Sequence, residues 1–306
     1  MKLKILGMVT VLLLTMSISA YAKQGCGSTG IWLQVLGSGG PEISDKRASS
    51  GYLLWQDGRA RILVDMGPGS MLRYEESGAR IEDLEVILLT HLHVDHSADL
   101  PALIKASYFT ERTKDLPIYG PSGNAQMPDT TAFVQSLFSD PAGTYKYLAG
   151  YLAQGEAYRL QPHNVSANGK TVQQVMKGQD LNITAVAVHH GPIPALAWRI
   201  DIGGRTIAFS GDMNGDNHTL PMLASGANLL VAHNAIPQNA KGAARGLHMP
   251  PSVIGEIAAE AKVKQLVLSH RMLRTLGREA ESKTEIRKRY TGPVMFADDG
   301  QCFKVN

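Results

Sequence analysis

The stretch His91-Leu92-His93-Val94-Asp95-His96 places three imidazoles and one carboxylate within six consecutive positions. It follows the apolar run Val86-Ile87-Leu88-Leu89-Thr90, which has the composition of a buried β-strand. A loop that leaves the end of a strand lets these side chains converge, and neutral imidazole and carboxylate are the ligands that zinc and similar ions favour. The stretch therefore predicts a metal site at a strand end. Scattered surface histidines are the weaker interpretation.

The first residues have the pattern of a secretory signal peptide. Two lysines precede the apolar residues 5–18, and Ala20-Tyr21-Ala22 has small residues at both positions that a signal peptidase requires. A membrane anchor is less well supported, because about 20 apolar residues are needed to span a bilayer. We expect a signal peptide over 1–22, cleaved after Ala22, and a mature domain over 23–306 that is periplasmic or secreted and does not associate with the membrane.

Composition and charge limit the class of protein and its partners. Of 306 residues, 44% are hydrophobic and 19% are charged, as in an ordinary globular protein with a real core. Removal of residues 1–22 lowers the net charge from +3 to +1, because two lysines and no acidic residue are lost. The mature chain has no block of five or more basic residues. We therefore expect no nucleic acid as a partner.

The chain has two cysteines, Cys26 and Cys302, which lie near opposite ends of the mature domain. Disulfides persist in oxidising compartments, to which an exported chain is delivered. We expect one bridge between them, and two unpaired thiols are the alternative.

Regular elements are expected on both sides of a less regular segment. Apolar runs predict strands at 31–36, 52–55, 62–64, 86–90, 183–188, 195–202, 205–209, 229–232, 265–268, 294–297 and 302–305, and helices at 97–109, 251–261 and 279–290. Residues 110–180 contain turn signals such as Gly120-Pro121 and Asp140-Pro141, together with many aromatic residues. We expect this segment to be an insertion of helices and loops that lies over the active site.

Three further expected strands end in residues that can bind a metal. The strand at 183–188 runs into His189-His190, the strand at 205–209 precedes Asp212, and the strand at 265–268 precedes His270. Active sites of α/β folds form at the edge where strands end. Because side chains alternate along a strand, His189 and His190 should point to opposite faces, and the alternation alone leaves open which of them faces the site.

These motifs resemble those of the metallo-β-lactamase superfamily, and their layout is similar to its ribonuclease Z-like and arylsulfatase-like branch. The resemblance covers residues 31–303, and its motifs are Leu36-Gly37-Ser38-Gly39-Gly40-Pro41, Val64-Asp65-Met66-Gly67, residues 91–96, His190-Gly191-Pro192, Phe209-Ser210-Gly211-Asp212 and Leu268-Ser269-His270. It implies an α/β fold, an αββα sandwich with two packed sheets and helices on the outer faces. It also favours His190 over His189, because His190 directly precedes the Gly-Pro turn.

The resemblance also implies a site for two divalent metal ions, of which zinc is the expected one. The first ion would be bound by His91, His93 and His190, the second by Asp95, His96 and His270, and Asp212 would bridge them. Two such ions generate hydroxide from water at ordinary pH, and Asp95 would orient that hydroxide. His248 is the candidate that would donate a proton to the leaving group.

The expected function is that of an exported two-metal hydrolase in which a metal-bound hydroxide cleaves a small-molecule ester of the sulfate or phosphodiester type, aryl esters included. Asn234 and Pro250 replace a Glu and a Thr that the ribonuclease Z-like branch carries, and the bridging Asp212 argues against a true zinc β-lactamase. The alternatives are a β-lactamase-like or lactonase-like hydrolase and a non-catalytic metal-binding protein on the same fold.

Overall fold

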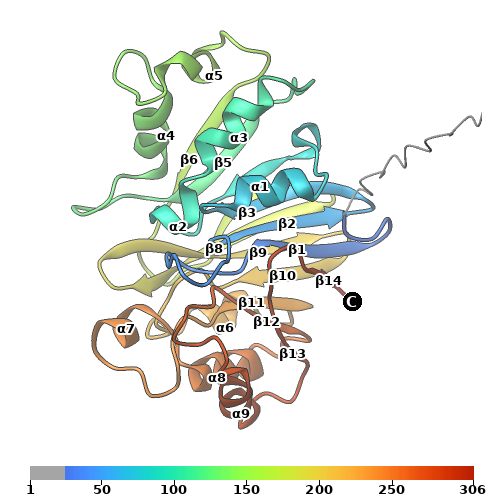
Figure 1. Cartoon of the computed structure of the whole chain (residues 1–306), viewed down its shortest axis with the longest axis vertical. Coiled ribbons are helices and arrows are strands. Elements are labelled where there is room, and N and C mark those ends of the chain that lie inside the picture. The colour runs from blue at the N-terminus through green and yellow to red at the C-terminus, as the bar shows by residue number, and fades with distance from the viewer. Residues whose placement is uncertain (1–24) are drawn as a thin grey trace, which may run out of the picture.

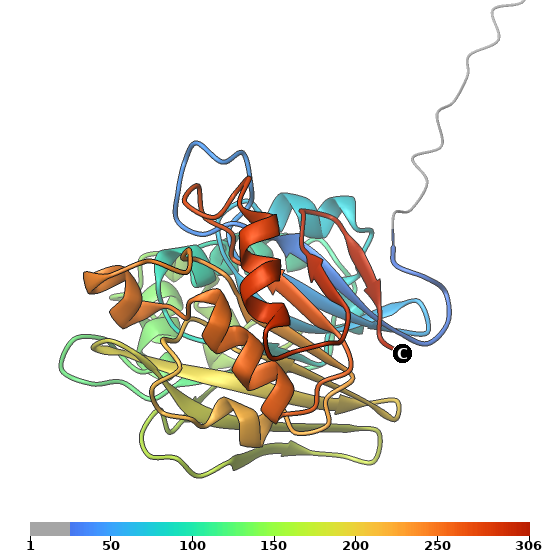
Figure 2. The same ribbon diagram turned by 90° about the horizontal axis from the view of Figure 1, so that it is seen from below.

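The computed structural model describes residues 25–306 as two packed β-sheets with helices on their outer faces, which is the expected αββα sandwich (Figure 1). The view from below shows the second sheet covered by its own helices (Figure 2). The expected signal peptide, residues 1–22, lies outside the described residues. Within residues 25–306, no helix is both long enough and apolar enough to cross a membrane.

Each sheet has seven strands and contains both antiparallel and parallel pairs. The first sheet has the order β14 (Cys302–Lys304), β1 (Ile31–Gly37), β2 (Gly51–Gln56), β3 (Arg59–Met66), β4 (Val86–Leu88), β5 (Leu116–Pro121) and β6 (Leu160–Val165). The second has the order β13 (Val294–Phe296), β12 (Leu266–Ser269), β11 (Leu229–His233), β10 (Arg205–Phe209), β9 (Ile193–Ile202), β8 (Leu181–His190) and β7 (Gln173–Lys177).

The helices fall into two groups, one for each sheet (Figure 1). Beside the first sheet are α1 (Ser70–Glu76), α2 (Val94–Ser97), α3 (Leu100–Ser107), α4 (Thr130–Phe138) and α5 (Gly150–Ala153), with the short 3-10 helices η1 (Ile81–Asp83) and η2 (Lys146–Leu148). Beside the second are α6 (Leu220–Leu223), α7 (Gly242–Leu247), α8 (Pro251–Glu260) and α9 (Glu279–Arg287).

Alternating side chains of the strands build three apolar layers. Leu54 of the first sheet and Trp198 of the second lie in the layer between the sheets, and both are fully buried. The opposite face of the first sheet packs against Leu103 and Phe138 of its helices, and the second sheet packs in the same way against Ile254 of α8. Burying both faces of each sheet explains the nearly continuous apolar runs from which the strands were predicted.

The segment 110–180 differs from the expected insertion of helices and loops. It does contain α4 and α5, but β5 and β6 extend the first sheet and β7 forms an edge of the second. The strands β6 and β7 are edge strands with many polar residues, so they lack the apolar runs that reveal central strands. In β5 the signals Gly120 and Pro121 mark the end of a strand and not a loop.

The two ends of the described chain are joined in the first sheet. A disulfide connects Cys26 to Cys302, as expected, and β14 pairs antiparallel with β1 from Trp32 opposite Lys304 to Gln34 opposite Cys302. The bridge spans 276 residues. In the loop-entropy model a ring of this size stabilises the fold by about 5–6 kcal/mol.

The carboxyl ends of the parallel strands lie together at one end of the sandwich. In the first sheet β3 and β4 are parallel, and in the second β10, β11 and β12 are parallel. Acidic residues and histidines lie at these carboxyl ends: Asp65 in β3, His91 after β4, Asp212 after β10, His233 in β11 and His270 after β12. The topology thus brings distant parts of the sequence to one edge.

Gly67 allows the 91–96 loop to pack directly against the end of β3. A Cβ atom at this position would lie 2.1 Å from the carbonyl oxygen of Asp95, so any other residue would displace the loop. This close approach explains why the motif Asp65-Met66-Gly67 ends in glycine.

Candidate metal centre

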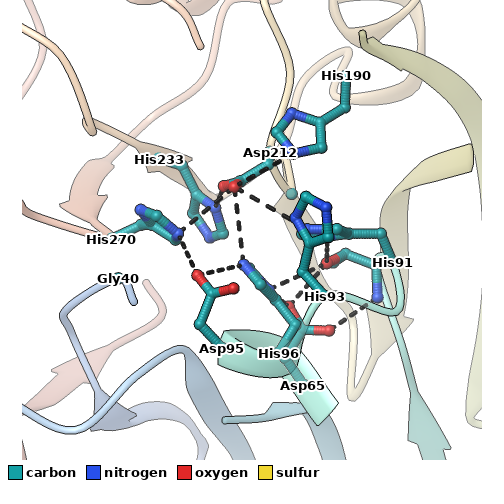
Figure 3. A network of polar contacts seen from close by, with 12 residues as sticks. Gly40, Asp65, His91, His93, Asp95, His96, His190, Asp212, His233 and His270 are labelled. Carbon is teal, nitrogen blue, oxygen red and sulfur yellow. Dashed lines mark hydrogen bonds and ion pairs between the residues drawn. The ribbon is translucent and has the colours of Figure 1, made fainter. Parts of the chain in front are cut away.

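The structure brings together all seven residues that the sequence predicted as metal ligands (Figure 3). His91 and His93 come from the loop after β4, His190 from the end of β8, Asp212 from the loop after β10, and His270 from the loop after β12. Asp95 and His96 lie in α2, the single helical turn that follows the first two histidines.

Three histidines form the first part of the site. The ligand atoms of His91, His93 and His190 all lie within 4.8 Å of one another. His91 and His190 are buried and His93 is half-buried. The neighbouring His189 is exposed, so strand alternation directs His190, and not His189, into the cluster.

The second part lies on the other side of Asp212. His270 Nε2 lies 3.2 Å from Asp95 Oδ2, and His96 Nε2 lies 3.5 Å from the same oxygen. The rings of His96 and His270 are stacked, with centroids 5.3 Å apart. The carboxylate of Asp95 therefore faces both imidazoles from one side.

One oxygen atom occupies the middle of the whole arrangement. Five imidazole nitrogens surround Asp212 Oδ2 at 3.4 to 4.0 Å, and they belong to His91, His96, His190, His248 and His270. His248 lies in the loop between α7 and α8, so the structure also places the predicted proton donor at the site. Asp212 is thus the one carboxylate in the described chain that faces both groups of histidines.

The donor atoms fit divalent metal ions. Within residues 25–306, the Nε2 atoms of His91, His96 and His190 are buried and have no hydrogen-bond partner. Leaving a buried polar atom unpaired costs about 1–3 kcal/mol, so three of them aimed at one point need an explanation. Imidazole nitrogens and carboxylate oxygens are the usual donors for zinc and other first-row ions, and a bound cation would satisfy all three.

The charges of the site agree with this donor set. Burial would raise the pKa of Asp212, but the histidines around it lower that pKa well below its usual range, so the carboxylate is ionised. Burial lowers the pKa of His91 well below its usual value and keeps the ring neutral. At His96 the carboxylates of Asp95 and Asp65 outweigh burial and raise the pKa. The site thus contains an ionised carboxylate and a neutral imidazole, the forms in which these side chains bind a cation.

Two buried residues at the site were not among the predicted site residues. His233 Nδ1 lies 2.6 Å from Asp212 Oδ1, and Asp65 Oδ2 lies 2.7 Å from His96 Nδ1. Both residues lie in strands whose carboxyl ends meet at this edge, which is the rule that identified Asp212 and His270. Applied to the strands expected at 62–64 and 229–232, the same rule would have found them.

Comparison with known proteins agrees with this architecture. A family model described as "Beta-lactamase superfamily domain" matches residues 60–271. Ribonuclease Z of Mycobacterium sp. (strain KMS) is 28% identical over 281 residues, covering 88% of this chain and 94% of the relative. Ribonuclease Z of Enterococcus faecalis (strain ATCC 700802 / V583) is 28% identical over 282 residues, covering 81% and 89%.

Two solved structures have a similar fold. A metallo-β-lactamase fold protein from Bacillus subtilis has a TM-score of 0.68 and 22% identity, covering 89% of this chain and 98% of that chain. Human tRNase Z, short form, has a TM-score of 0.68 and 20% identity, covering 90% and 99%.

The relatives contradict one expectation. A small-molecule ester was expected as the partner and nucleic acid was not, whereas the curated relatives are named as ribonucleases and one similar structure as a tRNase. The expectation rested on the absence of a basic block, and it was wrong because a weakly charged chain can still carry a site that acts on a phosphodiester bond.

Proposed function

Because the chain belongs to the β-lactamase superfamily and is a hydrolase of the metallo-β-lactamase fold, we propose that it is a two-metal phosphodiesterase that cleaves RNA. The observation that supports two ions is the position of Asp212 Oδ2, with imidazole nitrogens of both histidine groups within 4.0 Å of it. The ribonuclease Z name of the relatives supports RNA as the substrate class.

The residues would divide the work as follows. One ion would be held by His91, His93 and His190, the other by Asp95, His96 and His270, and Asp212 would be shared. Divalent ions, zinc being the proposed species, lower the pKa of a coordinated water and take up negative charge on phosphoryl oxygens. Asp95 would orient the attacking water by accepting a hydrogen bond from it, since its carboxylate is ionised and faces the middle of the site.

A substrate panel tests this proposal. The zinc-loaded chain is expected to cleave a 3′-extended transfer-RNA transcript and to release nitrophenolate from bis(4-nitrophenyl) phosphate, and chelation by EDTA should abolish both. The panel also contains 4-nitrophenyl sulfate, a lactone and a β-lactam. Hydrolysis of one of these three with no cleavage of RNA would contradict the proposal.

His248 is proposed to donate the proton that the leaving oxygen needs. The side chain is buried, and its Nδ1 lies 3.8 Å from Asp212 Oδ2. The ribose oxygen released from RNA is a poor leaving group, whereas nitrophenolate leaves without a proton. His248→Ala should therefore slow RNA cleavage by about a hundredfold and cleavage of bis(4-nitrophenyl) phosphate much less, as steady-state rates would measure.

Metal content is the control for that variant. His248 also lies close enough to His190 and Asp212 to hold an ion with them. If His248→Ala lost a metal ion or slowed both substrates equally, the residue would be a ligand and not a proton donor.

We further propose that the chain is exported. The signal pattern of residues 1–22 predicts it, and a disulfide between Cys26 and Cys302 is the kind of bond that an oxidising compartment preserves. Mass spectrometry of the chain from the periplasm should find a mature protein that begins at Lys23. An intact chain confined to the cytoplasm would contradict export.

A further inference from the structure

Imidazole rings surround the carboxylate of Asp212 (Figure 3), and the contacts of its two oxygens differ. Oδ2 faces the imidazoles of the proposed metal centre, whereas Oδ1 lies 2.6 Å from Nδ1 of His233. A carboxylate oxygen accepts hydrogen bonds, so in this 2.6 Å contact the hydrogen is carried by His233 Nδ1. One of the two oxygens is thus already engaged by a residue of the chain.

His233 is held in place at its backbone and at the other end of its ring. It is the last residue of β11, it is buried, and its backbone N–H donates to Ser210 Oγ at 3.1 Å. With a hydrogen on Nδ1, its Nε2 is an acceptor, and the hydroxyl of Tyr52 lies 3.1 Å from it. The Tyr52 hydroxyl also lies 2.9 Å from Ser269 Oγ.

This chain of contacts connects the two sheets behind the metal centre. Tyr52 belongs to β2 of the first sheet, whereas His233 and Ser269 end neighbouring strands of the second. Ser269 directly precedes His270, so the same contacts reach a second proposed ligand. The ring of His233 also stacks on that of His270, with centroids 4.9 Å apart.

His233 could be taken for a ligand, because it lies in one group with His96, Asp212 and His270 that could hold an ion. The hydrogen bonds of its ring nitrogens contradict this assignment. Both nitrogens have hydrogen-bond partners, Asp212 and Tyr52, whereas the Nε2 atoms of His91, His96 and His190 have no hydrogen-bond partner within residues 25–306. A nitrogen that already donates to a carboxylate has no lone pair for a metal.

We propose that His233 is a positioning residue that engages Asp212 Oδ1 and thereby directs Oδ2 alone to both metal ions. This inference rests on the proposed two-metal site. Without the contact, the Asp212 side chain could rotate about its χ2 angle and offer either oxygen to one ion. With it, the shared oxygen stays at the point where both histidine groups meet. Groups that orient metal ligands in this way change metal affinity by about 10–100-fold.

Zinc titration of purified variants, followed by calorimetry, tests the proposal. In His233→Ala the affinity for the second zinc ion should fall by about 10–100-fold. In His233→Asn the amide nitrogen stands near the place of Nδ1 and can still donate to Asp212, so most of the affinity should return. Tyr52→Phe keeps the contact between His233 and Asp212 and removes only the hydroxyl that lies against the other nitrogen of the His233 ring. The loss of zinc affinity in Tyr52→Phe should therefore be smaller than the loss in His233→Ala.

Two controls separate positioning from a general loss of structure. His189→Ala removes a histidine that is exposed and outside the cluster, and it should bind zinc like the unaltered chain. Electron paramagnetic resonance of the manganese-loaded proteins should show exchange coupling between two ions in the unaltered chain and in His233→Asn, and weakened coupling in His233→Ala. A residue that only stabilises the fold would not alter this coupling in a folded variant.

The outcomes are distinct. Two tightly bound, exchange-coupled ions in His233→Ala would overturn this inference and leave the proposed function standing. Equal losses of zinc affinity in His233→Asn and His233→Ala would also overturn it, because a hydrogen-bond donor to Asp212 Oδ1 would then not restore the affinity. An unaltered chain that binds no metal would overturn the two-metal proposal and this inference together.

Discussion

Replacing Asp212 by alanine is expected to lower RNA cleavage by at least about a thousandfold and to leave at most one tightly held ion in each chain. Asp212 Oδ2 is the atom nearest to both histidine groups, and its removal leaves Asp95 as the one anionic ligand of the proposed set. Two doubly charged ions a few ångströms apart repel each other strongly unless an anion lies between them. Metal analysis after dialysis and single-turnover cleavage of labelled RNA would measure both effects.

Asp216→Ala is the matched control for that variant. Asp216 lies four positions further along the same loop, is exposed, and contacts Asn214 and Arg245 outside the metal centre. Its loss should leave metal content and turnover within a fewfold of the unaltered chain. Two tightly held ions in Asp212→Ala would show that the bridge has been assigned to the wrong residue.

The parts of the site that the sequence predicted share one property: each ligand follows an apolar run. A buried strand can be predicted from its composition, and the residue after it must lie at the edge of the sheet. His91, Asp212 and His270 were found in this way, and strand alternation together with the Gly-Pro turn distinguished His190 from His189. The local sequence pattern therefore suffices to predict a site residue that directly follows a buried strand.

Contacts between residues that are distant in the sequence were not predictable from the local pattern. His233 follows an expected strand, but its contact with Tyr52, which lies 181 positions away and in the other sheet, leaves no signal in the sequence around either residue. The strands β6 and β7 pair at sheet edges, so they carry few apolar residues, and nothing in their composition distinguishes them from loops. The expectation that excluded nucleic acid failed because it rested on the absence of a basic block, and recognition of a phosphodiester at a metal centre needs no such block.

Replacing Asp65 is expected to have the second large effect, because this residue supports both the stability of the fold and the metal centre. Its carboxylate is fully buried at the end of β3 and accepts hydrogen bonds from Thr90 N at 2.7 Å, Thr90 Oγ1 at 2.8 Å and His96 Nδ1 at 2.7 Å. Asp65→Ala leaves these buried donors without a partner. The free energy of unfolding of the metal-free chain should fall by about 3–5 kcal/mol, as denaturant titration would measure.

Asp65→Asn separates the two roles of this residue. Asparagine keeps the size of the side chain and tolerates the left-handed backbone at this position, where φ is 55°, so most of the stability should be retained. Zinc affinity should still fall by about 10–100-fold. In the neutral ring that would bind a metal, the carboxylate accepts from His96 Nδ1 and so leaves the lone pair on Nε2, the atom that faces Asp95 and Asp212. An amide that donates to Nδ1 would move the hydrogen to Nε2 and block that lone pair.

Asp57→Asn is the control for this substitution, because Asp57 also has a left-handed backbone, with φ 49°, but is exposed in the turn between β2 and β3. It should change neither zinc affinity nor stability by more than a few tenths of a kcal/mol. If Asp65→Asn bound zinc like the unaltered chain, the hydrogen on His96 would not be set by Asp65. The contact would then serve the fold alone, and His96 would have to take its orientation from Asp95 and the stacked ring of His270.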